Sequence, residues 1–178
     1  VDGLRLYTMI PAASGSIADW ASDLPRIKAM GFNAVHLLPV TTLDVSQSPY
    51  AASDLFDVDH RYLSGGERSD GLAQLDAYVE RARELGMRLC FDLVLNHIGV
   101  QSAMVKKAPE WIVPDAGRAD GNKRARYWAD GQWRAWEDLV LINYEHPSEI
   151  VRAELWAYMI EYALFWARYA DATGGFEK

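Results

Sequence analysis

The stretch "RLCFDLVLNHIG" (residues 88–99) is a nearly unbroken apolar run that is interrupted by Asp92 and ends near Asn96 and His97. A short apolar run of this kind is typical of a strand that is covered on both faces in a parallel sheet. In α/β folds, functional side chains gather at the carboxyl ends of such strands, because there the chain leaves the core and meets a cleft. We therefore expect a functional site at the far end of this strand.

Taken alone, the same polar residues have a simpler interpretation. Asp92 would be a structural carboxylate satisfied by its neighbours, and His97 a strand-end histidine, since most buried polar groups are paired. An unpaired buried charge costs several kcal/mol, so an arginine from a neighbouring strand is the partner that we expect for Asp92. The rest of the chain decides between the two interpretations.

The order strand, helix, glycine, strand recurs along the chain and predicts βα units around a parallel sheet. Crossover connections between parallel strands are nearly always right-handed, so the units should wind one way round. The expected strands are residues 3–10, 33–40 and 87–97, and the expected helices are residues 14–30, 69–86 and 147–170.

The first expected helix has clear signals at both ends. Ser16 with Asp19 three residues later forms a capping-box pattern, and Gly31 fits the position just past the last turn. Pro25 is a poor interior residue, so we expect two helical pieces, the second of which begins near Asp23.

Residues 98–146 show no clear periodicity, although they include four of the seven tryptophans. A structureless loop of this length is unusual in a compact domain, so the segment is predicted to be functional or a small subdomain. On the third helix, by contrast, Trp156 and Trp166 are expected to lie in the core.

The composition excludes several classes of function. The formal net charge is -7, with 18 basic against 25 acidic residues, which disfavours nucleic acid or an anionic membrane surface as a partner. No apolar run is long enough to span a membrane, and the first residues lack the order of a signal peptide, which favours the cytoplasm. The single cysteine, Cys90, lies in the apolar strand, where we expect a buried and inert thiol.

Three segments, in this order, resemble the hallmarks of the alpha-amylase family, glycoside hydrolase family thirteen. They are "SPYAASD" (residues 48–54), "DLVLNH" (residues 92–97) and "DLVLINYEHPSE" (residues 138–149). The third departs from the family pattern, because Val140 and Leu141 replace its proline and aspartate. The segment "LPRIKAMGFNAVHLLPV" (residues 24–40) is similar to the first-helix and second-strand stretch of the family.

This resemblance implies an α/β fold, namely a partial (βα)8 TIM barrel of about three and a half βα units. A long inserted loop, like the family's domain B, would follow the third strand. The implied organisation is residues 1–97 as the first barrel units, residues 98–146 as the insert, and residues 147–178 as the third helix and the start of a fourth strand.

The resemblance also implies roles for single residues. Tyr50 matches the tyrosine that stacks on the sugar at the cleavage subsite, and His97 matches the histidine that is hydrogen-bonded to that sugar. Asp92 matches the strand carboxylate that orients the site from below. Aromatic faces pack well on the apolar faces of sugar rings, so these roles agree with the chemistry of the side chains.

A structural calcium ion is implied in many members of the family. Asn96 matches one residue that helps to bind this ion, and Asn143 aligns with another position near it. Calcium prefers oxygen ligands, but both side chains are neutral, and few sites attract this cation without carboxylates. No other cofactor is expected.

The family cleaves its substrate with retention, using a carboxylate nucleophile and a second carboxylic acid. In the family these groups lie on the fourth and fifth strands, with a third carboxylate on the seventh. Here the chain reads "GGFEK" (residues 174–178), with Glu177 where an arginine is expected. We therefore expect no catalytic carboxylate in this chain, and a lone Glu177 does not meet the two-group requirement.

The predicted function is the N-terminal portion of a retaining hydrolase or transglycosylase that acts on alpha-glucan oligosaccharides or polysaccharides. A weak similarity around "APEW" (residues 108–111) leaves a glycogen-type maltosyltransferase open. The alternatives are a non-catalytic carbohydrate-binding or scaffold module of the same fold, and an unrelated βα-barrel enzyme. The open edge of a partial barrel further predicts self-association of the isolated chain.

Overall fold

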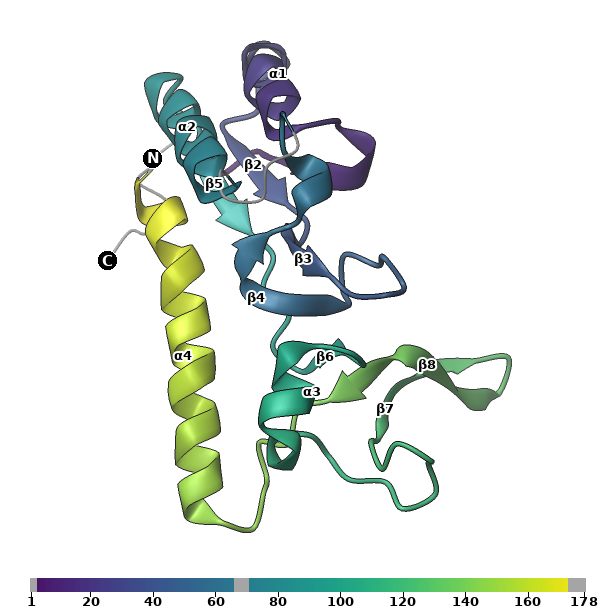
Figure 1. Cartoon of the computed structure of the whole chain (residues 1–178). Coiled ribbons are helices and arrows are strands. Elements are labelled where there is room, and N and C mark those ends of the chain that lie inside the picture. Colours follow the sequence, from purple (N-terminus) through teal and green to yellow (C-terminus); the bar gives the residue numbers. More distant parts are fainter. Residues whose placement is uncertain (1–2, 66–70, 173–178) are drawn as a thin grey trace. The chain divides into compact units, whose positions relative to one another are not determined.

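The computed structural model describes residues 3–65 and 71–172 of the chain (Figure 1). The expectations for "GGFEK" and Glu177 lie outside the described residues. The chain divides into two compact units. The first unit comprises residues 1–40, 56–93 and 163–178, and the second comprises residues 41–55 and 94–162.

The first unit contains a parallel sheet with the strand order β1-β2-β5. The bounds of these strands are β1 (Leu6–Met9), β2 (Ala34–Leu37) and β5 (Arg88–Phe91), and those of the two crossover helices are α1 (Ile17–Ala29) and α2 (Gly71–Glu84). Val35 and Leu89 are directly opposite each other and buried. The two helices pack through Trp20 and Tyr78, whose rings meet edge to face at 6.1 Å. This parallel order is the one that the βα pattern predicts.

Helix α1 confirms its end signals but not the predicted break. Ser16 and Asp19 form the capping box, and Gly31 has a φ of 95°, as a residue just past a helix end often does. The helix nevertheless runs without interruption through Pro25, so the prediction of two pieces is wrong. Proline removes one backbone hydrogen bond. The helix continues because Leu24 before Pro25 and Ile27 after it are both fully buried.

Strand β5 is shorter than predicted. It ends at Phe91, and Asp92 still donates its N–H to the Leu37 carbonyl at 3.0 Å, but the chain then leaves the sheet. Cys90 is exposed, which corrects the prediction of a buried thiol. Successive side chains of a strand point to opposite faces of the sheet. Leu89 therefore faces the buried side, while Cys90 faces the opposite side.

The second unit contains the segment that lacked periodicity, together with residues 41–55. Strands β3 (Thr41–Leu43) and β4 (Ala52–Val58) pair with each other, although β4 continues into the first unit. An antiparallel sheet has the order β6-β8-β7, with the bounds β6 (His97–Gly99), β7 (Arg124–Ala129) and β8 (Gln132–Leu141). The short helix α3 (Ala103–Lys107) follows β6, and single 3₁₀ turns lie at Pro11–Ala13, His60–Tyr62 and Pro109–Trp111.

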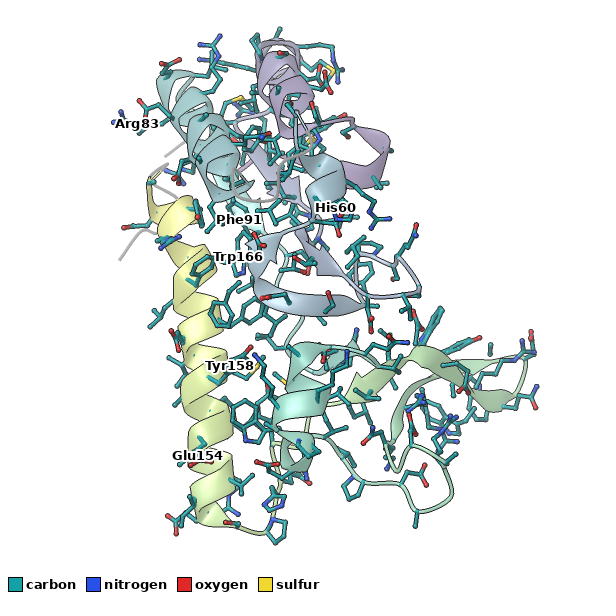
Figure 2. All side chains as sticks on the ribbon, viewed as in Figure 1. His60, Arg83, Phe91, Glu154, Tyr158 and Trp166 are labelled. Atoms are coloured by element: carbon teal, nitrogen blue, oxygen red, sulfur yellow. The ribbon has the colours of Figure 1, made fainter. Side chains whose placement is uncertain are left out.

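Helix α4 (Glu149–Ala172) corresponds to the third predicted helix. Trp166 is buried as expected, and its ring lies 5.5 Å from that of Phe91 in the first unit (Figure 2). Trp156 is 51% exposed, so its predicted place in the core is wrong. Apolar residues surround this helix almost completely, and the sequence pattern therefore does not show which face is covered. Among the described residues, no helix has an apolar run long enough to cross a membrane.

Candidate functional site

Tyr50 and His97 meet in the second unit. His97 is the first residue of β6 and pairs with Leu141 of β8, while Tyr50 lies in the segment that connects β3 to β4. The imidazole of His97 is hydrogen-bonded to the backbone of Tyr50. Tyr50 is 39% exposed. Two residues that are 47 positions apart in the chain thus form one cluster.

The carboxylate of Asp44 connects the Tyr50 segment to the end of β6. It accepts hydrogen bonds from the N–H of Gln101 at 2.7 Å and from the N–H of Val45 at 2.8 Å. The Asp44 N–H donates to the Ala51 carbonyl at 2.8 Å. This bond joins the two ends of the segment that contains Tyr50. Because Asp44 is only 8% exposed, these bonds replace the water that its carboxylate would otherwise bind.

Gly99 makes this connection possible by having no side chain. A Cβ at this position would overlap the Asp44 carboxylate and would lie 2.5 Å from the Asp44 Cβ. Asp44 and Gly99 were missed by sequence reasoning. The available signal was an aspartate shortly after the expected strand at residues 33–40, where its side chain can accept the next backbone N–H.

Burial favours the neutral form of the His97 ring. Burial lowers the pKa of His97, while the hydrogen bond to the Tyr50 backbone and the nearby charge of Asp138 act in the opposite direction. The Nε2 atom is buried and has no hydrogen-bond partner among the described residues. A neutral imidazole has one donor and one acceptor nitrogen, so Nε2 can make one hydrogen bond.

Asn96 and Asn143 lie close together because the backbone of Asn96 is hydrogen-bonded to Ile142, the residue before Asn143. The Asn96 carbonyl accepts the N–H of Ile142, and the N–H of Asn143 donates to the Trp111 carbonyl at 2.7 Å. The side chain of Asn96 is exposed. In residues 3–65 and 71–172, no group of three or more histidine, cysteine, aspartate or glutamate side chains could hold a metal ion. Calcium usually binds carboxylates, whereas Asn96 and Asn143 offer neutral oxygens, and a calcium ion at these residues stays a prediction.

Asp92 belongs to the first unit, and its partner differs from the predicted arginine. Its Oδ2 lies 3.7 Å from Nε2 of His36 on β2, and Nδ1 of His36 lies 3.3 Å from the Thr8 hydroxyl on β1. A polar row thus crosses the three strands. The cluster of Tyr50 and His97 belongs to the second unit, whereas Asp92 belongs to the first.

The carboxyl groups with shifted pKa values do not resemble a general acid, which needs a raised pKa. Among the described residues, each resolved carboxyl shift is downward, because a serine or an arginine stabilises the charged form. This holds for Asp19, Asp23, Glu80, Asp120 and Glu137.

Residues 1–113 match the family model described as the glucanotransferase domain of glycogen debranching enzyme. This match covers more than half of the chain. The fold and the segment motifs define an α/β chain of the alpha-amylase family, and the chain belongs to the glucanotransferase-domain family of glycogen debranching enzyme.

Relatives and solved structures agree with this assignment. The alpha-1,4-glucan:maltose-1-phosphate maltosyltransferase of Rhodospirillum rubrum is 27% identical in an alignment of 173 positions that covers 88% of this chain and 23% of the relative. The glycogen debranching enzyme of Saccharomyces cerevisiae is 27% identical over 110 residues, 62% of this chain and 7% of the relative. The chain therefore spans at most about a quarter of the length of these relatives.

Among solved structures, an alpha-amylase from Lactobacillus plantarum matches with a TM-score of 0.73 and 29% identity. The match covers 94% of this chain and 36% of that one. The alpha-amylase of Geobacillus thermoleovorans, complexed with acarbose, shows the same fold with a TM-score of 0.69 at 21% identity, over 94% of this chain and 38% of that one. These matches support the partial α/β barrel that the motifs predict.

The contact between Gly99 and Asp44 gives a first prediction. Gly99→Ala forces the Asp44 carboxylate away, and we expect the free energy of unfolding to fall by about 1–3 kcal/mol. Urea unfolding measures this change. Gly3→Ala is the matched control, because nothing lies within 4 Å of a Cβ there. Equal stability of the two variants would contradict the described contact.

The His97 pKa gives a second prediction. The folded pKa is lowered, so the unfolded chain binds a proton at higher pH, and stability should fall as the pH drops from about 6.5 through the folded pKa. NMR titration of the His97 ring should give a midpoint below that in the urea-unfolded chain. His97→Asn should remove this part of the pH dependence. A folded midpoint at or above the unfolded one would contradict burial as the dominant cause.

Proposed function

We propose that this chain is part of a retaining enzyme that acts on alpha-glucans, and that Tyr50 and His97 bind one glucosyl unit. The observation that carries this proposal is the hydrogen-bonded contact between the His97 ring and the Tyr50 backbone, beside an exposed Tyr50 ring. Aromatic rings pack on the apolar faces of sugars, and an imidazole ring can share a hydrogen bond with a sugar hydroxyl.

The chemical step requires two carboxyl groups on either side of the scissile bond, about 5–5.5 Å apart in retaining enzymes. We propose that the described residues bind and orient the sugar, and that other parts of the enzyme supply this pair. The downward pKa shifts of the carboxyl groups support this division of roles. Asp92 lies beside His36 in the first unit, and its family-implied role in orienting the sugar site stays a prediction.

The acceptor of the glycosyl group is proposed to be a second sugar. The family model describes a glucanotransferase domain, and several relatives are named maltosyltransferases. Water as acceptor is the alternative, because other relatives are named as an alpha-glucosidase and a maltase. The calcium ion implied for Asn96 and Asn143 rests on the resemblance alone, and no step is assigned to a metal.

Removal of the Tyr50 ring tests the binding role. Titration of the chain with maltotriose, followed by tryptophan fluorescence, should show saturable binding. Tyr50→Ala should weaken this binding about three- to tenfold, because the stacking surface is lost. Tyr50→Phe keeps the ring and is the control, with an expected change of less than about twofold.

Assays of the same chain on maltooligosaccharides should show no turnover. Turnover by the isolated chain would contradict the proposed division of roles. Binding that Tyr50→Ala leaves unchanged would contradict the assignment of the sugar site. The non-catalytic module remains the alternative, and turnover by the full-length protein that contains this chain would exclude it.

We also propose that the isolated chain self-associates through the edge of the parallel sheet. In the first unit, an apolar cavity of about 580 Å³ lies beside β5 and the last turns of α4. Leu4 and Leu164, which line it, are 60% and 66% exposed. A strand at the edge of a sheet beside exposed apolar side chains favours pairing with a second copy.

Sedimentation velocity over a range of concentrations tests this association. We expect a dimer that Leu164→Glu converts to a monomer, because a carboxylate would be buried in the contact. Ile160→Glu, on the same helix and 53% exposed, is the control and should leave the dimer intact. A compact monomer at every concentration would contradict the proposal.

A further inference from the structure

Strands β7 and β8 form a hairpin whose tip carries two exposed tryptophans. Asp130 and Gly131 connect the strands with φ angles of 53° and 74°, the two left-handed residues that a tight two-residue hairpin turn requires. Trp128 and Trp133 lie directly opposite each other next to this turn. Figure 1 shows that the hairpin extends away from α3 within the second unit.

The two tryptophan rings form a corner on one face of the hairpin. Their centroids are 5.4 Å apart and the rings are inclined by 76°. Trp128 is 59% exposed and Trp133 is 57% exposed. Arg126 lies on the same face, because it pairs with Ala135 two positions further along each strand, and its guanidinium carbon is 5.4 Å from the centre of the Trp133 ring.

The residues around the Trp128 and Trp133 rings indicate what kind of ligand they bind. They favour a polar ligand that has one apolar face, and they do not favour a protein partner. Polar and charged side chains border the tryptophans, and Arg134 is paired with Asp130 beside the turn. Protein interfaces bury a core from which charged residues are depleted. A neutral sugar chain instead needs flat rings for its apolar faces together with nearby donors for its hydroxyl groups, and Arg126 supplies such donors.

The hairpin is continuous with the strand that supports His97. His97 pairs with Leu141 of β8, and Trp133 lies eight positions earlier on the same strand. At about 3.3 Å per residue, this separation is roughly 26 Å. Trp133 therefore lies far beyond the reach of the sugar unit that contacts His97, and a ligand at the hairpin occupies a site of its own.

We propose that Trp128, Trp133 and Arg126 form a second binding site for an alpha-glucan chain, separate from the site of Tyr50 and His97. This inference rests on the proposed function for the nature of the ligand. The hairpin site holds a long glucan, while the first site holds the unit that reacts. The proposal implies that the substrate is a polymer and that short oligosaccharides do not need the hairpin.

Two ligands of different length test the proposal with this chain. Retardation in gels that contain glycogen measures binding of the polymer, and maltotriose titration measures the first site. Trp128→Thr with Trp133→Thr keeps residues that favour strands but removes both rings. We expect this double variant to bind glycogen about fivefold or more weakly, with maltotriose affinity unchanged.

Two further variants keep the result interpretable. Trp156→Ala removes an equally exposed tryptophan from α4 and should leave glycogen binding unchanged. Arg126→Gln keeps both rings, and we expect glycogen binding about two- to threefold weaker with maltotriose affinity unchanged. If the double variant fails to fold, Arg126→Gln alone decides, and an unchanged affinity for glycogen overturns the proposal.

The possible outcomes separate the two proposals. Unchanged glycogen binding in the double variant, with maltotriose still bound, overturns the hairpin site and leaves the proposed function intact. A wild-type chain that binds neither ligand overturns both. Loss of a dimer in the double variant, without loss of glycogen binding, overturns the sugar assignment and shows that a second copy of the chain occupies the tryptophans.

Discussion

The buried carboxylate of Asp44 is the interaction on which the candidate site depends. Its hydrogen bond to the N–H of Gln101 joins the segment between β3 and β4 to the residues that follow β6. This bond acts together with the hydrogen bond between the His97 ring and the Tyr50 backbone to hold the segment beside β6. Gly99 allows the close approach, and the neutral His97 ring then completes the contact through the Tyr50 backbone. We infer that the Asp44 carboxylate contributes most to placing the Tyr50 ring beside the His97 imidazole.

Local signals in the sequence predicted much of the fold. The capping box of Ser16 and Asp19 and the glycine at position 31 depend only on neighbouring residues, and both have the predicted roles. The parallel order of β1, β2 and β5 follows from alternating strands and helices, which leave few possible topologies. The motifs around Tyr50 and His97 identified the family, because three short segments in a fixed order are far more specific than any one of them.

Features that depend on tertiary contacts could not be predicted in the same way. Helix α4 is apolar almost all round, so nothing in its pattern separates the buried Trp166 from the exposed Trp156. The apolar run that begins at Arg88 reads as one strand, but the chain leaves the sheet after Phe91 and pairs again only at His97, with β8. Asp44 was missed because its partner Gln101 is 57 positions away. The hairpin tryptophans show the same difficulty, since only the structure reveals that two of them form an exposed pair.

A double-mutant cycle between Asp44 and Tyr50, measured as maltotriose affinity, tests the central claim most directly. If Asp44 acts by placing Tyr50, then Asp44→Ala weakens binding, and the double variant with Tyr50→Ala binds no more weakly than Tyr50→Ala alone. Circular dichroism of each variant confirms that the fold is retained. The account would be contradicted if the losses of maltotriose binding free energy in the two single variants added up in the double variant. It would also be contradicted if Asp44→Ala bound maltotriose as tightly as the wild-type chain.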